Sequence, residues 1–188
     1  MSRRLVITAD DLGRDPSGTT AIQDLHAAGA ITRTTLIPVS PHAAQAAAIL
    51  RDNGLDPQLH LTLTSDAAPG PWLPLTDGPT LLDEHGQLPA DPRRAEREAD
   101  PGDVRDELEA QLDWMHRAGL CPRTADSHSG VLYGLHGGQQ LLGMVLSWCG
   151  EDWMKKSNIV LTDWSSWVRG SDVSLDLSKA IIYLNKSR

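Results

Sequence analysis

The sequence lacks two features that would indicate a membrane or nucleic-acid partner. No stretch approaches the roughly 18 consecutive apolar residues that a membrane-spanning helix needs. The 17 lysines and arginines are scattered among 25 acidic residues, giving a net charge of −8 and no basic stripe of the kind that binds phosphates. We therefore expect neither a membrane partner nor a nucleic-acid partner.

Cysteine is scarce, and the N-terminal residues carry no secretion signal. Cys121 and Cys149 lie far apart and match no zinc-binding or redox spacing. Residues 1–4 lead directly into a short strand-like run at 5–8, without an apolar signal region or a small-residue cleavage site. These observations predict a reduced, cytoplasmic setting.

Residue usage changes abruptly near position 150. Every lysine follows it, all 12 prolines lie at or before Pro122, and Ala180 is the sole alanine beyond it. We therefore divide the chain into residues 1–150 and a compositionally distinct tail, 151–188. Three origins of this tail stay open: a genuine variant end, an unrelated appended piece or a shifted reading frame. The tail can supply at most a strand or two, with 159–162 and 181–184 the best candidates.

Short strand-like runs alternate with helical segments between residues 4 and 148. Strands are expected at 4–8, 34–38, 58–63 and 123–127, and helices at 16–28, 41–52, 101–118 and 135–148. Residues 65–92 are rich in Pro, Gly and Asp and predict a long loop. This alternation implies βα units and an α/β fold with parallel strands. Ligands in such folds bind beyond the carboxyl ends of the strands.

Three of these strands carry potential metal ligands near their ends. Asp10 and Asp11 follow the first strand, His60 lies in the third, and Asp126-Ser127-His128 ends the fourth. Neighbouring strand residues point to opposite faces, so the two aspartates can share a site only where the strand ends and turns, for which Gly13 is suited. Two imidazoles and one carboxylate can hold a divalent cation, while a second carboxylate acts as general base.

Each of these motifs also has a simpler explanation. The aspartate pair could be a solvated turn, and His60 a half-buried strand residue. Asp126 could cap backbone N–H groups in a turn. Their joint occurrence at three strand ends favours a site, although the spacing alone does not name a reaction.

The motifs together resemble a known family. ADDLG at 9–13, HLT at 60–62 and DSH at 126–128 occur in the order found in the YdjC-like carbohydrate deacetylases, which include the chitooligosaccharide (diacetylchitobiose) deacetylases. The resemblance covers about residues 4–148 and does not extend to the tail after 150. It implies an irregular (β/α) barrel and the removal of acetyl groups from N-acetylated sugars.

The same resemblance implies roles for individual residues. Asp11, His60 and His128 would ligate one divalent cation, Mg²⁺ or Zn²⁺, and Asp10 would be the catalytic base. The implied partner is an acetylated amino sugar or oligosaccharide. Whether the chain also forms a homo-oligomer stays open, and no residue is assigned to substrate binding.

The chain departs from the family pattern in two places. Ser129, Gly130 and Val131 stand where many members continue with histidines, which puts substrate contacts in question. A full barrel needs roughly 250 residues, so 188 residues predict an incomplete (β/α) barrel with parallel strands.

Two further functional hypotheses follow. One is a truncated, non-catalytic protein that binds metal or sugar. The other, a receiver-type signalling module, is disfavoured because His60 occupies the third-strand position where an aspartate is needed, and because no lysine precedes Lys155.

Overall fold

Four parallel strands form the centre of the molecule. The computed structural model describes residues 6–54, 57–66, 70–136, 139–150, 160–161 and 182–183. The central strands lie side by side in chain order: β1 (Val6–Leu12), β2 (Arg33–Leu36), β3 (Pro57–Leu61) and β4 (Thr124–Ser127). This arrangement confirms the expected α/β class with parallel strands.

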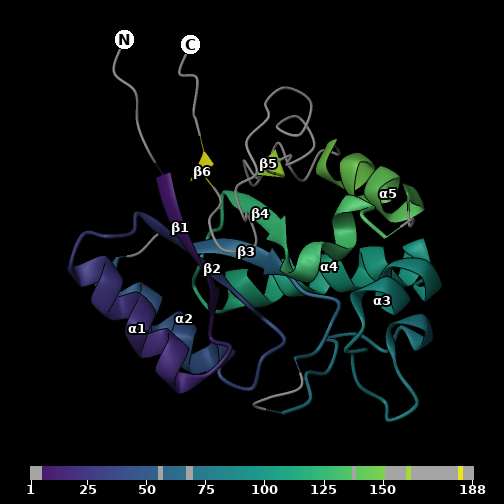
Figure 1. Cartoon of the computed structure of the whole chain (residues 1–188), viewed down its shortest axis with the longest axis horizontal. Coiled ribbons are helices and arrows are strands. Elements are labelled where there is room, and N and C mark those ends of the chain that lie inside the picture. The colour runs from purple at the N-terminus through teal and green to yellow at the C-terminus, as the bar shows by residue number, and fades with distance from the viewer. Residues whose placement is uncertain are drawn as a thin grey trace.

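Three helices connect the central strands: α1 (Pro16–Ala27), α2 (Ala43–Asn53) and α4 (Pro101–Arg117). They lie on the same side of the sheet, below it in the view of Figure 1. Right-handed crossovers between strands in sequential order place these helices on one face of the sheet. The chain leaves the carboxyl end of each strand through a loop, and these loops can carry a site.

Two short strands extend the sheet at its edges. β5 (Val160–Leu161) runs parallel to β4, and β6 (Ile182–Tyr183) runs antiparallel to β1. Both lie within the two tail segments predicted to be strands. The sheet formed by the described strands is open, as expected for an incomplete barrel, and the other tail residues lie outside the described residues.

An apolar stripe on α4 closes the core against the strands. Val104, Leu108, Leu112 and Met115 are all buried, which confirms the side chains predicted to share one face of this helix. They join the buried strand leucines in one continuous hydrophobic cluster.

A helix that the sequence analysis does not predict follows the long loop. This helix, α3 (Pro92–Glu98), has no stripe of large apolar side chains, but it begins as α1 and α4 do. Asp15, Asp91 and Asp100 each cap a helix by accepting a backbone hydrogen bond, and proline follows each of them.

The remaining helical segments are η1 (Pro79–Leu81) within the long loop, η2 (His128–Tyr133) directly after β4, and α5 (Gln139–Gly150). None of the helices in the described part of the chain combines the length and apolarity needed to cross a membrane.

Candidate metal centre

A β-bulge positions the two adjacent aspartates. Between Ala9 and Leu12, β1 has two residues, Asp10 and Asp11, opposite a single residue of β2, Thr35. Asp11 has φ +67°, in the left-handed region that aspartate adopts more readily than most residues. The Asp11 N–H donates to Thr35 Oγ1 (3.1 Å), and the Thr35 hydroxyl donates to Asp10 Oδ1 (3.3 Å). The expectation that the strand ends before the pair is wrong, because the bulge supplies the necessary turn within β1.

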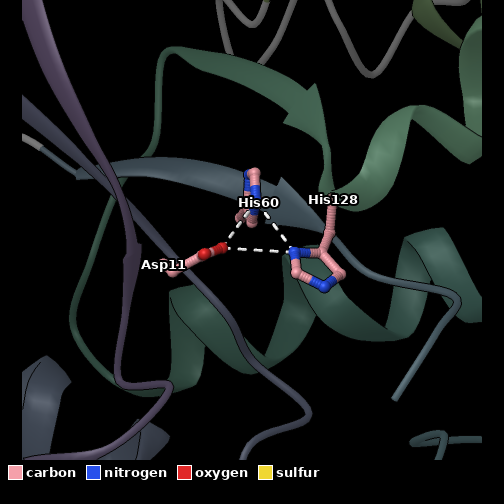
Figure 2. A group of neighbouring side chains, drawn as sticks. All are labelled: Asp11, His60 and His128. Atoms are coloured by element: carbon pink, nitrogen blue, oxygen red, sulfur yellow. Dashed lines mark hydrogen bonds and ion pairs between the residues drawn. The ribbon is translucent and has the colours of Figure 1, made fainter. Parts of the chain in front are cut away.

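Asp11, His60 and His128 converge beyond the carboxyl ends of β1, β3 and β4 (Figure 2). Asp11 Oδ1 lies 3.2 Å from His60 Nε2 and 3.2 Å from His128 Nδ1, and the two nitrogens are 3.3 Å apart. Ligand atoms around a divalent cation bound at about 2.0–2.1 Å have similar separations. The donor set therefore fits one divalent cation.

A second group, formed by Asp10, His60 and Asp126, also has its donor atoms within 4.8 Å of one another. Within this group His60 Nδ1 lies 2.6 Å from Asp126 Oδ1, a short hydrogen-bond distance. A cation there would break this hydrogen bond, whereas a cation held by His60 Nε2 leaves it intact. We therefore favour the group formed with Asp11 and His128.

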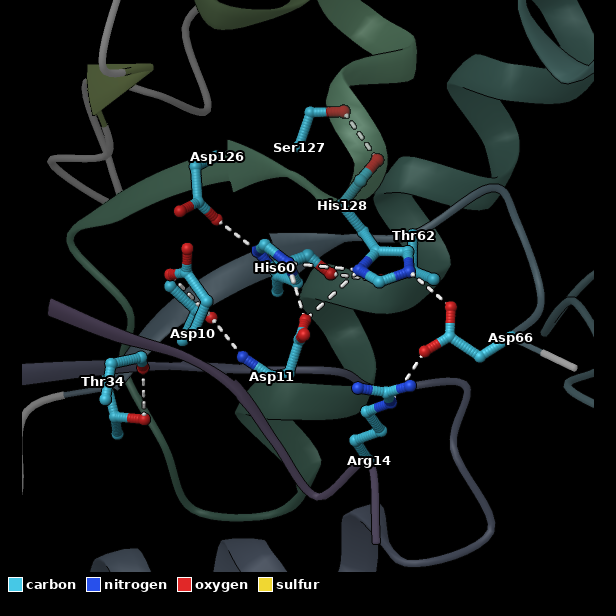
Figure 3. A network of polar contacts seen from close by, with 12 residues as sticks. Asp10, Asp11, Arg14, Thr34, His60, Thr62, Asp66, Asp126, Ser127 and His128 are labelled. Carbon is cyan, nitrogen blue, oxygen red and sulfur yellow. Dashed lines mark hydrogen bonds and ion pairs between the residues drawn. The ribbon is translucent and has the colours of Figure 1, made fainter. Parts of the chain in front are cut away.

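In both histidines a carboxylate lies beside the ring nitrogen that points away from Asp11 (Figure 3). Asp126, almost fully buried, contacts His60 Nδ1, while Asp66 Oδ1 lies 3.3 Å from His128 Nε2. The other oxygen of Asp66 lies 2.6 Å from Arg14 Nε. No sequence pattern assigns Asp126 to His60, and none singles out Asp66 or Arg14.

Burial and neighbouring charges shift the protonation of the two aspartates in the cation-free site. Burial raises the pKa of Asp10 to about 6; the charge of His60 opposes this rise, and the charges of Asp126 and Asp11 add to it. Burial also acts to raise the pKa of Asp11, but hydrogen bonds to His128 and His60 outweigh it and hold the pKa well below its usual range. Asp11 is therefore ionised, and Asp10 titrates near neutral pH.

The pKa values of the two histidines both rise. Burial lowers the pKa of His60, but the charge of Asp126 and the hydrogen bond to Asp11 outweigh burial, and the pKa rises well above 6.5. The pKa of His128 also rises, because its hydrogen bonds to Asp11 and Asp66 outweigh burial. Without a cation the imidazoles thus hold protons that a cation would displace.

Side chains of α4 tie the loops beside the site to the helix layer. Gln111 makes two hydrogen bonds to the backbone of Thr62, accepting from its N–H (3.0 Å) and donating to its carbonyl (2.7 Å). The buried carboxylate of Glu107 accepts from the N–H groups of Leu75 and Thr76, from the Thr76 hydroxyl, and from Gln111 Nε2.

The loop segment anchored in this way carries Trp72 into contact with the site. Trp72 is fully buried, and its ring centroid lies 5.4 Å from that of His128. The sequence predicts the loop but not this contact, since a single tryptophan between prolines gives no periodic signal.

This chain is similar in sequence to known carbohydrate deacetylases. A carbohydrate deacetylase from Enterococcus faecalis (strain ATCC 700802 / V583) is 34% identical over 149 residues, which cover 78% of this chain and 55% of that protein. A carbohydrate deacetylase from Geobacillus stearothermophilus is 34% identical over 134 residues, 70% of this chain and 51% of that protein. The chain therefore spans about half the length of these curated relatives.

A solved structure shares the fold. It is a protein from Enterococcus faecalis V583, described provisionally as a cellobiose-phosphate cleavage protein, with TM-score 0.69 and 31% identity over 84% of this chain and 57% of that one. The family profile described as YdjC-like protein matches residues 4–179, so the match continues past residue 148, where the sequence analysis places its end. With this match covering most of its length, the chain belongs to the YdjC-like protein family.

Proposed function

We propose that this chain carries the metal site of a carbohydrate deacetylase. In this proposal Asp11, His60 and His128 hold one divalent cation, Mg²⁺ or Zn²⁺, and Asp10 is the general base. The reaction is hydrolysis of the N-acetyl group of an amino sugar or oligosaccharide. The observation that carries the proposal is the triangle of donor atoms 3.2–3.3 Å apart. The carbohydrate deacetylases among the relatives support the substrate class.

The residues divide the chemistry between them. When bound, the cation would polarise the substrate carbonyl and lower the pKa of a water molecule. Asp10 takes a proton from the attacking water as the oxygen of that water bonds to the acetyl carbon. The C–N bond then breaks, releasing acetate, and the sugar nitrogen takes up the proton that the water gave to Asp10, which regenerates the carboxylate. In the cation-free site burial raises the pKa of Asp10 to about 6, so its carboxylate is mostly ionised at neutral pH and can accept a proton.

A second candidate function is non-catalytic binding of metal or sugar. It is favoured by one observation, the span of this chain over only 51–55% of the two carbohydrate deacetylases. The segments that those longer proteins have beyond the matched region could carry part of the sugar pocket.

Metal content and acetate release together test both candidates. The wild-type protein should bind about one divalent cation, and His60→Ala and His128→Ala should abolish binding. The control His116→Ala, at an exposed position of α4, should bind as the wild type does. Acetate release from a chitobiose-type substrate then supports the deacetylase, whereas metal binding without acetate release supports the non-catalytic candidate. Unchanged stoichiometry in both site variants would show that the ligand assignment is wrong.

A further inference from the structure

The two histidines of the triangle present different ring nitrogens to its centre. His60 directs Nε2 toward Asp11, whereas His128 directs Nδ1 toward it. A neutral imidazole has one protonated nitrogen and one free lone pair, and only the lone pair can bind a cation. The site therefore needs His60 protonated on Nδ1 and His128 protonated on Nε2.

A carboxylate faces each nitrogen that must carry the proton. Asp126 Oδ1 lies 2.6 Å from His60 Nδ1, and Asp66 Oδ1 lies 3.3 Å from His128 Nε2 (Figure 3). Asp11 faces the other nitrogen of both rings, but with a cation bound it would be a ligand and not an acceptor. An ionised carboxylate only accepts hydrogen bonds, so Asp126 and Asp66 then each select the tautomer that keeps the proton on their own side. We propose that Asp126 and Asp66 are positioning residues that set opposite tautomers in the two histidines and so aim both lone pairs at one cation. This inference rests on the metal site of the proposed function.

The two carboxylates are not equivalent. Free histidine favours the tautomer protonated on Nε2, so His128 needs little help, whereas His60 is held in the less favoured form. The Asp126 side chain is 1% exposed, while that of Asp66 is 23% exposed and also pairs with Arg14. Asp126 should therefore contribute more to cation affinity than Asp66.

Register explains how Asp126 reaches His60. The two residues are direct partners across the parallel strands β3 and β4, and their side chains lie on the site side of the sheet. The second oxygen of Asp126 is buried without a hydrogen-bond partner among the described residues. Burying an ionised carboxylate is costly unless it is paired or hydrogen-bonded. Accepting a hydrogen bond from the Nδ1–H of a metal-binding imidazole compensates for this cost.

The test combines cation affinity with the imidazole ¹⁵N spectrum. Asp126→Asn can turn its NH₂ toward His60 Nδ1, which favours the tautomer that blocks Nε2. Zn²⁺ affinity, measured by competition with a chelator, should fall roughly 10- to 100-fold in this variant. Asp66→Asn should lose less than about 10-fold. Asp113→Asn, the same charge change at an exposed position of α4, serves as control and should bind as the wild type does.

The ¹⁵N spectrum reports on tautomers directly. In the Zn²⁺-loaded wild type, His60 should be protonated on Nδ1 and His128 on Nε2, and in Asp126→Asn only the His60 signals should change. The opposite tautomer in either histidine would overturn the inference, as would Asn variants that bind Zn²⁺ as tightly as the control. If the wild type binds no cation, the proposed function fails. The metal-free spectrum at a pH above the imidazolium titration then decides the tautomer of His60, because Asp126 lies closer to this ring (2.6 Å) than Asp11 does (3.2 Å). If Asp126→Asn does not fold, Asp66→Asn and the wild-type spectrum provide the decision.

Discussion

Substitution of Glu107 by glutamine should loosen the loop that holds Trp72 against His128. Glu107 is fully buried on α4, and its carboxylate accepts five hydrogen bonds from Leu75, Thr76 and Gln111. The variant has almost the same volume but replaces one acceptor oxygen with an NH₂ group. It therefore tests whether the loop depends on acceptors at both positions of the carboxylate.

The magnitude follows from the fixed orientation of Gln111. If the new amide keeps its oxygen toward Leu75 and Thr76, its NH₂ faces Gln111 Nε2, another donor. Gln111 cannot turn its amide without losing both of its hydrogen bonds to the backbone of Thr62. At least one buried donor thus loses its partner, at a cost of about 1–3 kcal/mol. Removing a buried charge offsets part of this cost, since burial raises the pKa of Glu107 despite the hydrogen bonds that it accepts.

We expect Glu107→Gln to lower the free energy of unfolding by about 2 kcal/mol. For a chain of this size that corresponds to a fall of roughly 4–8 °C in Tm. Thermal unfolding followed by circular dichroism measures the change. Glu109→Gln, at an exposed position of the same helix, is the matched control and should stay within about 0.5 kcal/mol of the wild type. Equal Tm values for the two variants would refute the argument.

Three other predictions concern the base, pH and assembly. Asp10→Asn should keep the cation but lower the rate of hydrolysis roughly 10²- to 10⁴-fold. Asp11→Asn should instead weaken cation binding. A metal-bound structure with Asp10 as the ligand would reverse these roles. Because the folded pKa values of His60 and His128 are raised above 6.5, their contribution to metal-free stability is complete below that pH and is lost as pH rises through the folded values. Cation binding instead strengthens with pH, so the gain in Tm on adding metal should grow with pH, and a gain that shrinks would contradict the ligand set. The described strands form an open sheet with two-residue strands at its edges, so the protein should self-associate or be poorly soluble, and a soluble, monodisperse monomer in light scattering would contradict this.

The sequence predicts best what depends on local periodicity and chain order. The stripe on α4 is readable because Val104, Leu108, Leu112 and Met115 recur at helical spacing. The convergence of distant motifs follows from topology, because parallel strands bring their carboxyl ends to one edge of the sheet. By contrast, α3 has no apolar stripe, and only the Asp91–Pro92 pair, the same start signal as Asp15–Pro16, could have indicated it.

Contacts that depend on register and on irregular backbone lie beyond such reasoning. Asp126 faces His60 because the two residues are partners in the ladder between β3 and β4, and a shift of one residue would turn Asp126 to the other face of the sheet. The bulge at Asp10 and Asp11 breaks the alternation from which side-chain direction is read. Asp66 lies in a loop without periodicity, and only the folded path of that loop brings it to His128. Strand order therefore predicts which side chains meet at the site, whereas register and loop path determine which nitrogen of each histidine is left free.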